Sequence, residues 1–157
     1  MALSVPDAFT SLALTLGVAY VPHAIRGALV HAKLGAMKKA GAKVPGSYDI
    51  RNPRTACALA TDDSPAGVRI AAMAAAHNNA LENFSFIAAG VLAARFAKVD
   101  RPLVDSLAAA YLGLRALYVV LYYYSSNKAV AGTRSLVWLA SVAVPIFLLV
   151  AAAKASA

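Results

Sequence analysis

The residues of this chain best suited to chemistry lie in one long apolar stretch, Arg69 to Arg95. The stretch is rich in Ala and free of Pro, which predicts a helix. At about 1.5 Å per residue the helix is roughly 40 Å long, enough to cross the hydrocarbon core of a bilayer. Its first half nevertheless carries five polar residues, namely His77, Asn78, Asn79, Glu82 and Asn83. Polar groups are costly in lipid, so these should face protein, water or a ligand. Hydrogen bonding between helices of a bundle is the simpler interpretation, and a binding site is the alternative.

A second polar stripe follows in the predicted helix at about 102–125. Tyr111, Arg115, Tyr118 and Tyr122 lie within about 60° of one another on a helical wheel. Arg115 is well inside the span, where a charged side chain should face the bundle interior or a wet cavity. Tyr123 and Tyr124 follow directly and are typical of the aromatic belt at a membrane surface.

The composition places most of the chain in a membrane. The 157 residues are 61% hydrophobic, with a formal net charge of +8. Much of the basic charge crowds one segment between two apolar spans, at Lys33, Lys38, Lys39, Lys43, Arg51 and Arg54. This is the distribution that the positive-inside rule produces, and it argues against a nucleic-acid-binding face. The lone Cys57 excludes an intramolecular disulfide, and the absence of Cys or His pairs at ligand spacing argues against a metal site.

The apolar runs predict an all-α integral membrane protein, a four-helix bundle formed by one domain. The expected spans are about 8–36, 67–97, 102–125 and 133–153, and the basic loop at 38–65 should be cytosolic with both termini on the other side. The multi-pass protein would lie in the endoplasmic reticulum of a eukaryote or the inner membrane of a bacterium. In this topology the start of the second helix, the end of the third and the start of the fourth are neighbours. The two polar stripes can therefore converge with Arg134 and Ser135, which are expected in the first turn of the last helix.

Such a convergence suits a small zwitterionic ligand with several carboxylates. Arginine binds a carboxylate as a planar fork, and Glu82 can accept a hydrogen bond from an ammonium group. Arg134 could in addition hold a thiolate, the reactive form of a thiol, with support from the dipole of its helix. Glutathione has all of these groups: two carboxylates, one ammonium and one thiol.

Three motifs resemble the MAPEG family, the membrane-associated proteins of eicosanoid and glutathione metabolism. They are AHNNALENFSF around Asn79 and Glu82, LRALYVVLYYY from Leu114 to Tyr124, and TRSLVW around Arg134. The resemblance implies a homotrimer with glutathione bound between neighbouring subunits. It also implies that Arg134 stabilises the glutathione thiolate and that the activity is conjugation, peroxide reduction or eicosanoid synthesis.

The resulting prediction is a glutathione transferase or peroxidase that acts on a lipophilic electrophile or hydroperoxide from the surrounding lipid. The predicted catalytic residues are Arg134 and Ser135, and the predicted glutathione-binding residues are Asn79, Glu82, Asn83, Arg115, Tyr118 and Tyr122. One departure from the family pattern is Ala75, where relatives usually have an arginine that helps to hold a glutathione carboxylate. This departure favours the alternative, a lipid-binding scaffold of the same fold without enzymatic activity. The sequence does not identify the second substrate.

Overall fold

The computed structural model describes residues 5–42, 58, 61–124 and 128–157. These residues form long helices and no strand, which confirms the all-α prediction. The helices are α1 (Ala8–Lys39), α3 (Pro65–Phe96), α4 (Arg101–Tyr123) and α5 (Lys128–Ala155).

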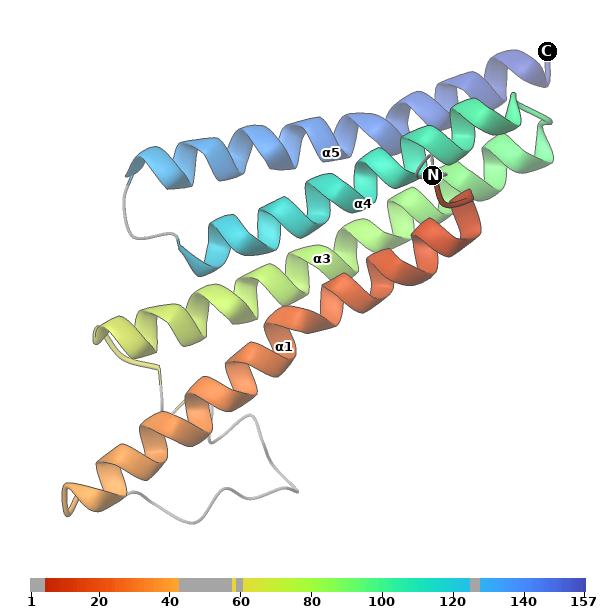
Figure 1. The fold of residues 1–157 in the computed structure, drawn as a ribbon. Helices are drawn as coiled ribbons and strands as arrows, with labels where there is room; N and C mark the ends of the chain where they lie inside the picture. The colour runs from red at the N-terminus through yellow and green to blue at the C-terminus, as the bar shows by residue number, and fades with distance from the viewer. Residues whose placement is uncertain (1–4, 43–57, 59–60, 125–127) are drawn as a thin grey trace.

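The helices run alongside one another in alternating directions (Figure 1). Helices α3 and α4 pack against each other, and each also packs against both α1 and α5. Within the described residues α1 and α5 do not pack against each other, so α3 and α4 form the central pair. The two polar stripes of the sequence therefore lie on the two helices at the centre of the bundle. We call the end where α3 and α5 begin and α4 ends the site end.

Side-chain caps explain where three helices begin. Asp7 accepts hydrogen bonds from the backbone N–H groups of Phe9 and Thr10 at the start of α1. Ser64 caps α3 through the N–H of Gly67, and Asp100 caps α4 in the same way. Each cap provides an acceptor for N–H groups that have no partner within the first turn.

The last helix begins earlier than the sequence predicted. It was expected near Thr133, but α5 already begins at Lys128. Lys128 to Ala131 are acceptable helix formers, and the single Gly132 costs only about 1 kcal/mol relative to Ala. Arg134 and Ser135 therefore lie in the second turn of α5 instead of the first.

Among the described residues, three helices are long and apolar enough to cross a membrane: α1, α4 and α5. Helix α3 is as long as α1, at 32 residues, but it carries the polar cluster. It is not among the three helices that are apolar enough to cross a membrane. The chain is thus a multi-pass integral membrane protein.

Ion pairs join the helices at both ends. At the end opposite the site end, the Asp105 carboxylate accepts from the backbone N–H of Ala8 at 2.7 Å and from the Arg95 guanidinium at 2.6 Å, so it links α1, α3 and α4. At the site end, Lys33 of α1 contacts Asp62 at 2.5 Å and Ser64 at 3.0 Å. Hydrogen bonds from Lys33 and Ser64 lower the pKa of the Asp62 carboxyl to about 2. The exposed contact therefore persists at neutral pH and is lost only as the pH falls from about 4 toward 2.

A close approach of α3 and α5 at Gly90 positions the two helices. A Cβ atom at Gly90 would lie 3.2 Å from the backbone oxygen of Pro145 and 3.3 Å from the Cβ of Leu148. Small residues allow helix backbones to approach in membranes, where packing replaces the hydrophobic effect. The side chains of Ile87, Val91 and Leu148 are fully buried around this contact.

We expect Gly90→Leu to push α3 and α5 apart and to lower the free energy of unfolding by about 1–3 kcal/mol, the usual cost of overpacking. Gly113→Leu in α4 is the matched control, because a Cβ at Gly113 meets nothing within 4 Å. The measurement is thermal unfolding of the detergent-purified variants. Equal melting temperatures for the two variants would contradict the close packing at Gly90.

Candidate functional site

A buried arginine lies between the two central helices. The side chain of Arg115 on α4 is only 2% exposed, and its Nη1 donates to the Oδ1 of Asn79 on α3 at 3.0 Å. Its guanidinium carbon lies 5.0 Å from the centre of the Tyr111 ring and 5.5 Å from that of Tyr118. Within the described residues, the Nε and Nη2 atoms of Arg115 are buried without a hydrogen-bond acceptor. Buried donors of this kind are rare and need an explanation, such as a ligand or a water molecule.

The neighbouring polar groups hold this arginine in place. The Tyr111 hydroxyl donates to the backbone oxygen of Asn83 at 3.1 Å. The Asn83 side-chain amide donates to the backbone oxygen of Asn79 at 2.9 Å. Tyr111, Arg115 and Tyr118 follow one another at the spacing of one helix face, so a single register of α3 against α4 satisfies all these contacts. Asn83 therefore supports the site through the backbone of α3.

A small cavity of about 140 Å³ opens next to Arg115. It is lined by Asn79, Tyr118, Tyr122, Arg134, Ser135 and Trp138. The guanidinium carbon of Arg134 lies 4.2 Å from the centre of the Tyr122 ring, which in turn packs edge-on against Tyr118 at 4.9 Å. A half-buried cation beside two phenol groups and an amide gives this cavity the character of an anion-binding site.

The structure brings together most of the residues that the sequence singled out. Five of the predicted site residues line the cavity, namely Asn79, Tyr118, Tyr122, Arg134 and Ser135. Arg115 lies behind it through its hydrogen bond to Asn79, and Asn83 is one turn further along α3. Glu82 differs: its side chain is exposed on the surface of α3 and does not line the cavity. The expected convergence of Glu82 with the two arginines is therefore absent within this single subunit.

One expectation about the start of α5 needs correction. Arg134 is in the second turn, and because the field of a helix dipole falls off within the first turn, the dipole adds little there. The Ser135 hydroxyl donates to the backbone oxygen of Ala131 at 3.2 Å. Its proton is therefore used within α5, although the side chain lines the cavity.

Sequence reasoning missed Trp138, and it left open whether His77 faces protein, water or a ligand. Trp138 is one turn beyond Arg134 on the same face of α5, and the i, i+4 spacing was the available signal. His77 was part of the polar cluster, but its Nδ1 forms a hydrogen bond of 2.8 Å with the backbone oxygen of Ala19. Its ring also packs beside Tyr20 and His23, so His77 joins α3 to α1 outside the cavity.

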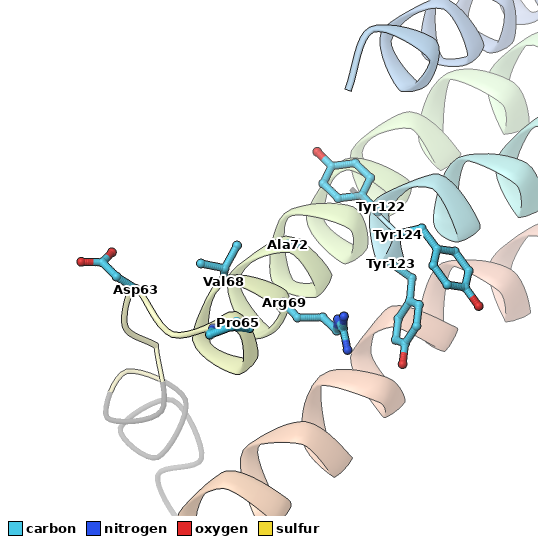
Figure 2. A pocket seen from close by; sticks show the side chains of 8 residues that line it. All are labelled: Asp63, Pro65, Val68, Arg69, Ala72, Tyr122, Tyr123 and Tyr124. Atoms are coloured by element: carbon cyan, nitrogen blue, oxygen red, sulfur yellow. The ribbon is translucent and has the colours of Figure 1, made fainter. Parts of the chain in front are cut away.

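A larger cavity of about 380 Å³ lies beside the first at the site end. It is lined by Asp63, Pro65, Val68, Arg69, Ala72, Tyr122, Tyr123 and Tyr124. Figure 2 shows Arg69 of α3 pointing toward Tyr123 and Tyr124 at the end of α4. The guanidinium carbon of Arg69 is 4.9 Å from the centre of the Tyr123 ring. Tyr123 and Tyr124, expected in an aromatic belt, thus form one wall of this cavity.

Comparison with known families identifies the chain. The sequence profile of the MAPEG family matches residues 8–154, which is nearly the whole chain and all four helices. The chain belongs to the MAPEG family. A search of curated proteins and a search of solved structures gave no match. MAPEG proteins include glutathione transferases and related enzymes, although some members are not transferases. Membership thus indicates a function related to glutathione or eicosanoids, without deciding which one.

The unpaired donors of Arg115 lead to a prediction about the stability of the bundle. Arg115→Met keeps an unbranched side chain and removes a buried charge with only one hydrogen bond, so it should leave the free energy of unfolding unchanged or raise it by about 1–3 kcal/mol. Tyr111→Phe is the matched variant. It should lower the free energy of unfolding by about 0.5–1.5 kcal/mol, because the hydrogen bond to the backbone oxygen of Asn83 is lost. Thermal unfolding of both variants in detergent is the measurement. A larger loss in Arg115→Met than in Tyr111→Phe would mean that Arg115 serves mainly to hold the helices together.

Proposed function

We propose that this MAPEG protein is a membrane glutathione transferase or peroxidase. It binds glutathione at the cavity beside Arg115 and uses the thiol against a lipophilic electrophile or hydroperoxide that arrives from the bilayer. The observation that supports this proposal is the convergence of Asn79, Tyr118, Tyr122, Arg134 and Ser135 on one cavity from three different helices. Arg134 is half-buried at the wall of this cavity, where its charge can hold a thiolate while its guanidinium stacks on Tyr122.

In this proposal glutathione supplies the reacting sulfur, and the residues of the chain bind and orient it. Arg134 holds the sulfur as a thiolate through its positive charge, which Tyr122 fixes in place by stacking at 4.2 Å. Asn79 offers its amide to the peptide, and the positive charge of Arg115, which is bonded to Asn79 from behind the cavity wall, attracts negative charge toward the same region. Ser135 contributes less, because its hydroxyl proton is already donated to Ala131.

We further propose that the site is completed by neighbouring copies of the chain in a homotrimer. A cavity of about 140 Å³ is smaller than the roughly 300–1,000 Å³ typical of ligand pockets. Glu82 is exposed near the middle of α3, the helix that runs from Pro65 to Phe96. Exposure of a charged group to lipid costs about 3 kcal/mol at the centre of a bilayer. A neighbouring subunit that covers Glu82 would remove this cost and enlarge the site.

The alternative function is a lipid-binding scaffold without enzymatic activity. Two features favour it: Ala75 provides no charge for a glutathione carboxylate, and Ser135 directs its proton into its own helix. The position of Arg134 distinguishes the two functions, because only the enzyme requires a cation beside the sulfur.

The first test of the enzyme concerns Arg134. A thiol with a pKa near 8.5 is only a few per cent thiolate at pH 7, and a shift of about 2 units, roughly 2.7 kcal/mol, would make it mostly thiolate. Since the helix dipole adds little, Arg134→Leu should abolish the ultraviolet absorbance of the bound thiolate and most conjugation activity, while glutathione still binds.

The control for this test is Arg101→Leu, whose side chain is 74% exposed at the opposite end of the bundle. The measurement is the thiolate absorbance titrated against pH in the parent and in both variants with bound glutathione. Identical curves for the parent and Arg134→Leu would contradict the enzyme and favour the scaffold.

The second test concerns the subunit interface. In mild detergent, light scattering should give the mass of three copies of the chain. If a neighbour covers Glu82 and the carboxylate serves the site, Glu82→Leu should weaken glutathione binding by about 1–3 kcal/mol. Ala89→Leu, also at an exposed position of α3, is the control and should leave binding unchanged. A monomeric mass, or a Glu82→Leu variant that is more stable and binds glutathione normally, would mean that Glu82 faces lipid.

A further inference from the structure

The two cavities at the site end share one side chain. Tyr122 lines both the cavity that contains Arg134 and the larger cavity that contains Arg69. Among the residues that line the two cavities, these arginines are the only cations. A ligand that passes Tyr122 therefore meets one guanidinium in each cavity.

The Arg69 guanidinium is oriented so that it can bind an anion. Its guanidinium stacks at 4.9 Å from the centre of the Tyr123 ring, and a stacked guanidinium keeps its N–H groups at the edge, in the plane where carboxylates bind. Among the described residues no ion pair is formed by Arg69. Asp63 lines the same cavity, but in Figure 2 its carboxylate points away from Arg69.

We propose that Arg69 binds the glycine carboxylate of glutathione, an assignment that rests on the function proposed above. If Arg134 holds the sulfur beside Tyr122, the two ends of the tripeptide must extend to either side of that ring. The Asn79 amide lies in the smaller cavity and suits the γ-glutamyl end. Glycine is the residue directly after cysteine, so its carboxylate lies about 5 Å beyond the cysteine Cα, and in this proposal it enters the larger cavity on the other side of Tyr122. There Arg69 is the cation that lines the wall.

The same assignment accounts for the absence of a charge at Ala75. Arg69 lies on the same helix six residues earlier, nearer the site end. A carboxylate that extends toward that end can therefore be neutralised without a cation at position 75.

The test compares glutathione with two analogues in which the glycine carboxylate is replaced by a neutral group: the glycine ethyl ester and the glycine amide of glutathione. Dissociation constants are measured by calorimetry on the full-length protein in detergent for the parent, Arg69→Ala, Arg69→Lys and the control Arg101→Ala. The parent and the control should bind glutathione about tenfold or more tightly than either analogue, the usual effect of a charge-assisted hydrogen bond.

Arg69→Ala should lose this preference through weaker binding of glutathione, with the affinities for both analogues unchanged. Arg69→Lys should keep part of the preference for glutathione, because the positive charge remains but the planar pair of guanidinium donors is lost. At saturating glutathione, Arg69→Ala should retain the thiolate absorbance, unlike a variant of Arg134.

Two different results would overturn the assignment. If the parent binds glutathione but Arg69→Ala keeps the full preference over the ester, Arg69 does not hold the glycine carboxylate, and the proposed function stands. If the parent binds no glutathione, the proposed function fails together with this assignment.

Discussion

The burial of Arg115 is the constraint on which the centre of this bundle depends. A guanidinium cannot lose its positive charge in a protein, so its surroundings must compensate for the missing water. The chain does so with the rings of Tyr111 and Tyr118 and with one amide oxygen from Asn79. These contacts require one register between α3 and α4, and the bond from Tyr111 to Asn83 enforces the same register. The same contacts fix the arrangement of the cavity wall, because Asn79 and Tyr118 both contact the buried arginine and line the cavity.

The membrane explains why so much polar chemistry is found on the two central helices. Helices α1 and α5 pack against the central pair and turn many apolar side chains outward, among them Phe9, Leu16, Ile146 and Phe147. Helix α3 can carry amides and a histidine because α1, α4 and α5 all pack against it. Asn78 and Glu82 are the exceptions in the polar cluster, because both are exposed on the surface of the single subunit. Arg115 thus lies inside the bundle with two donor atoms that have no acceptor among the described residues, whereas Glu82 lies on the outer surface of α3.

Most of the fold and much of the candidate site could be predicted from the sequence, since both depend on periodicity. The spacing of Tyr111, Arg115, Tyr118 and Tyr122 placed these residues on one face, and the polar cluster around Asn79 identified the facing helix. The start of α5 was missed because Gly132 and Thr133 resemble a connector when they are read alone, whereas in the structure they continue a helix that begins at Lys128. The roles of His77 and Trp138 depend on contacts with other helices, which helical spacing by itself does not determine. The match to the MAPEG family supports the predicted membrane bundle and leaves its activity open.

The position of Arg134 changes the physical account of how a thiolate would be stabilised. In the first turn of a helix, the dipole and the side-chain charge would act together on an anion. In the second turn the guanidinium must supply most of the stabilisation itself, so its distance from the sulfur and the exclusion of water from the cavity become decisive. The stacking of Arg134 on Tyr122 limits the motion of the charge, and Trp138 adds an apolar wall beside it. Arg115 and Arg134 thus differ in burial and in place: the fully buried arginine contacts two residues of the cavity wall from behind, and the half-buried one lines the cavity, where the proposed function has it act on the thiolate.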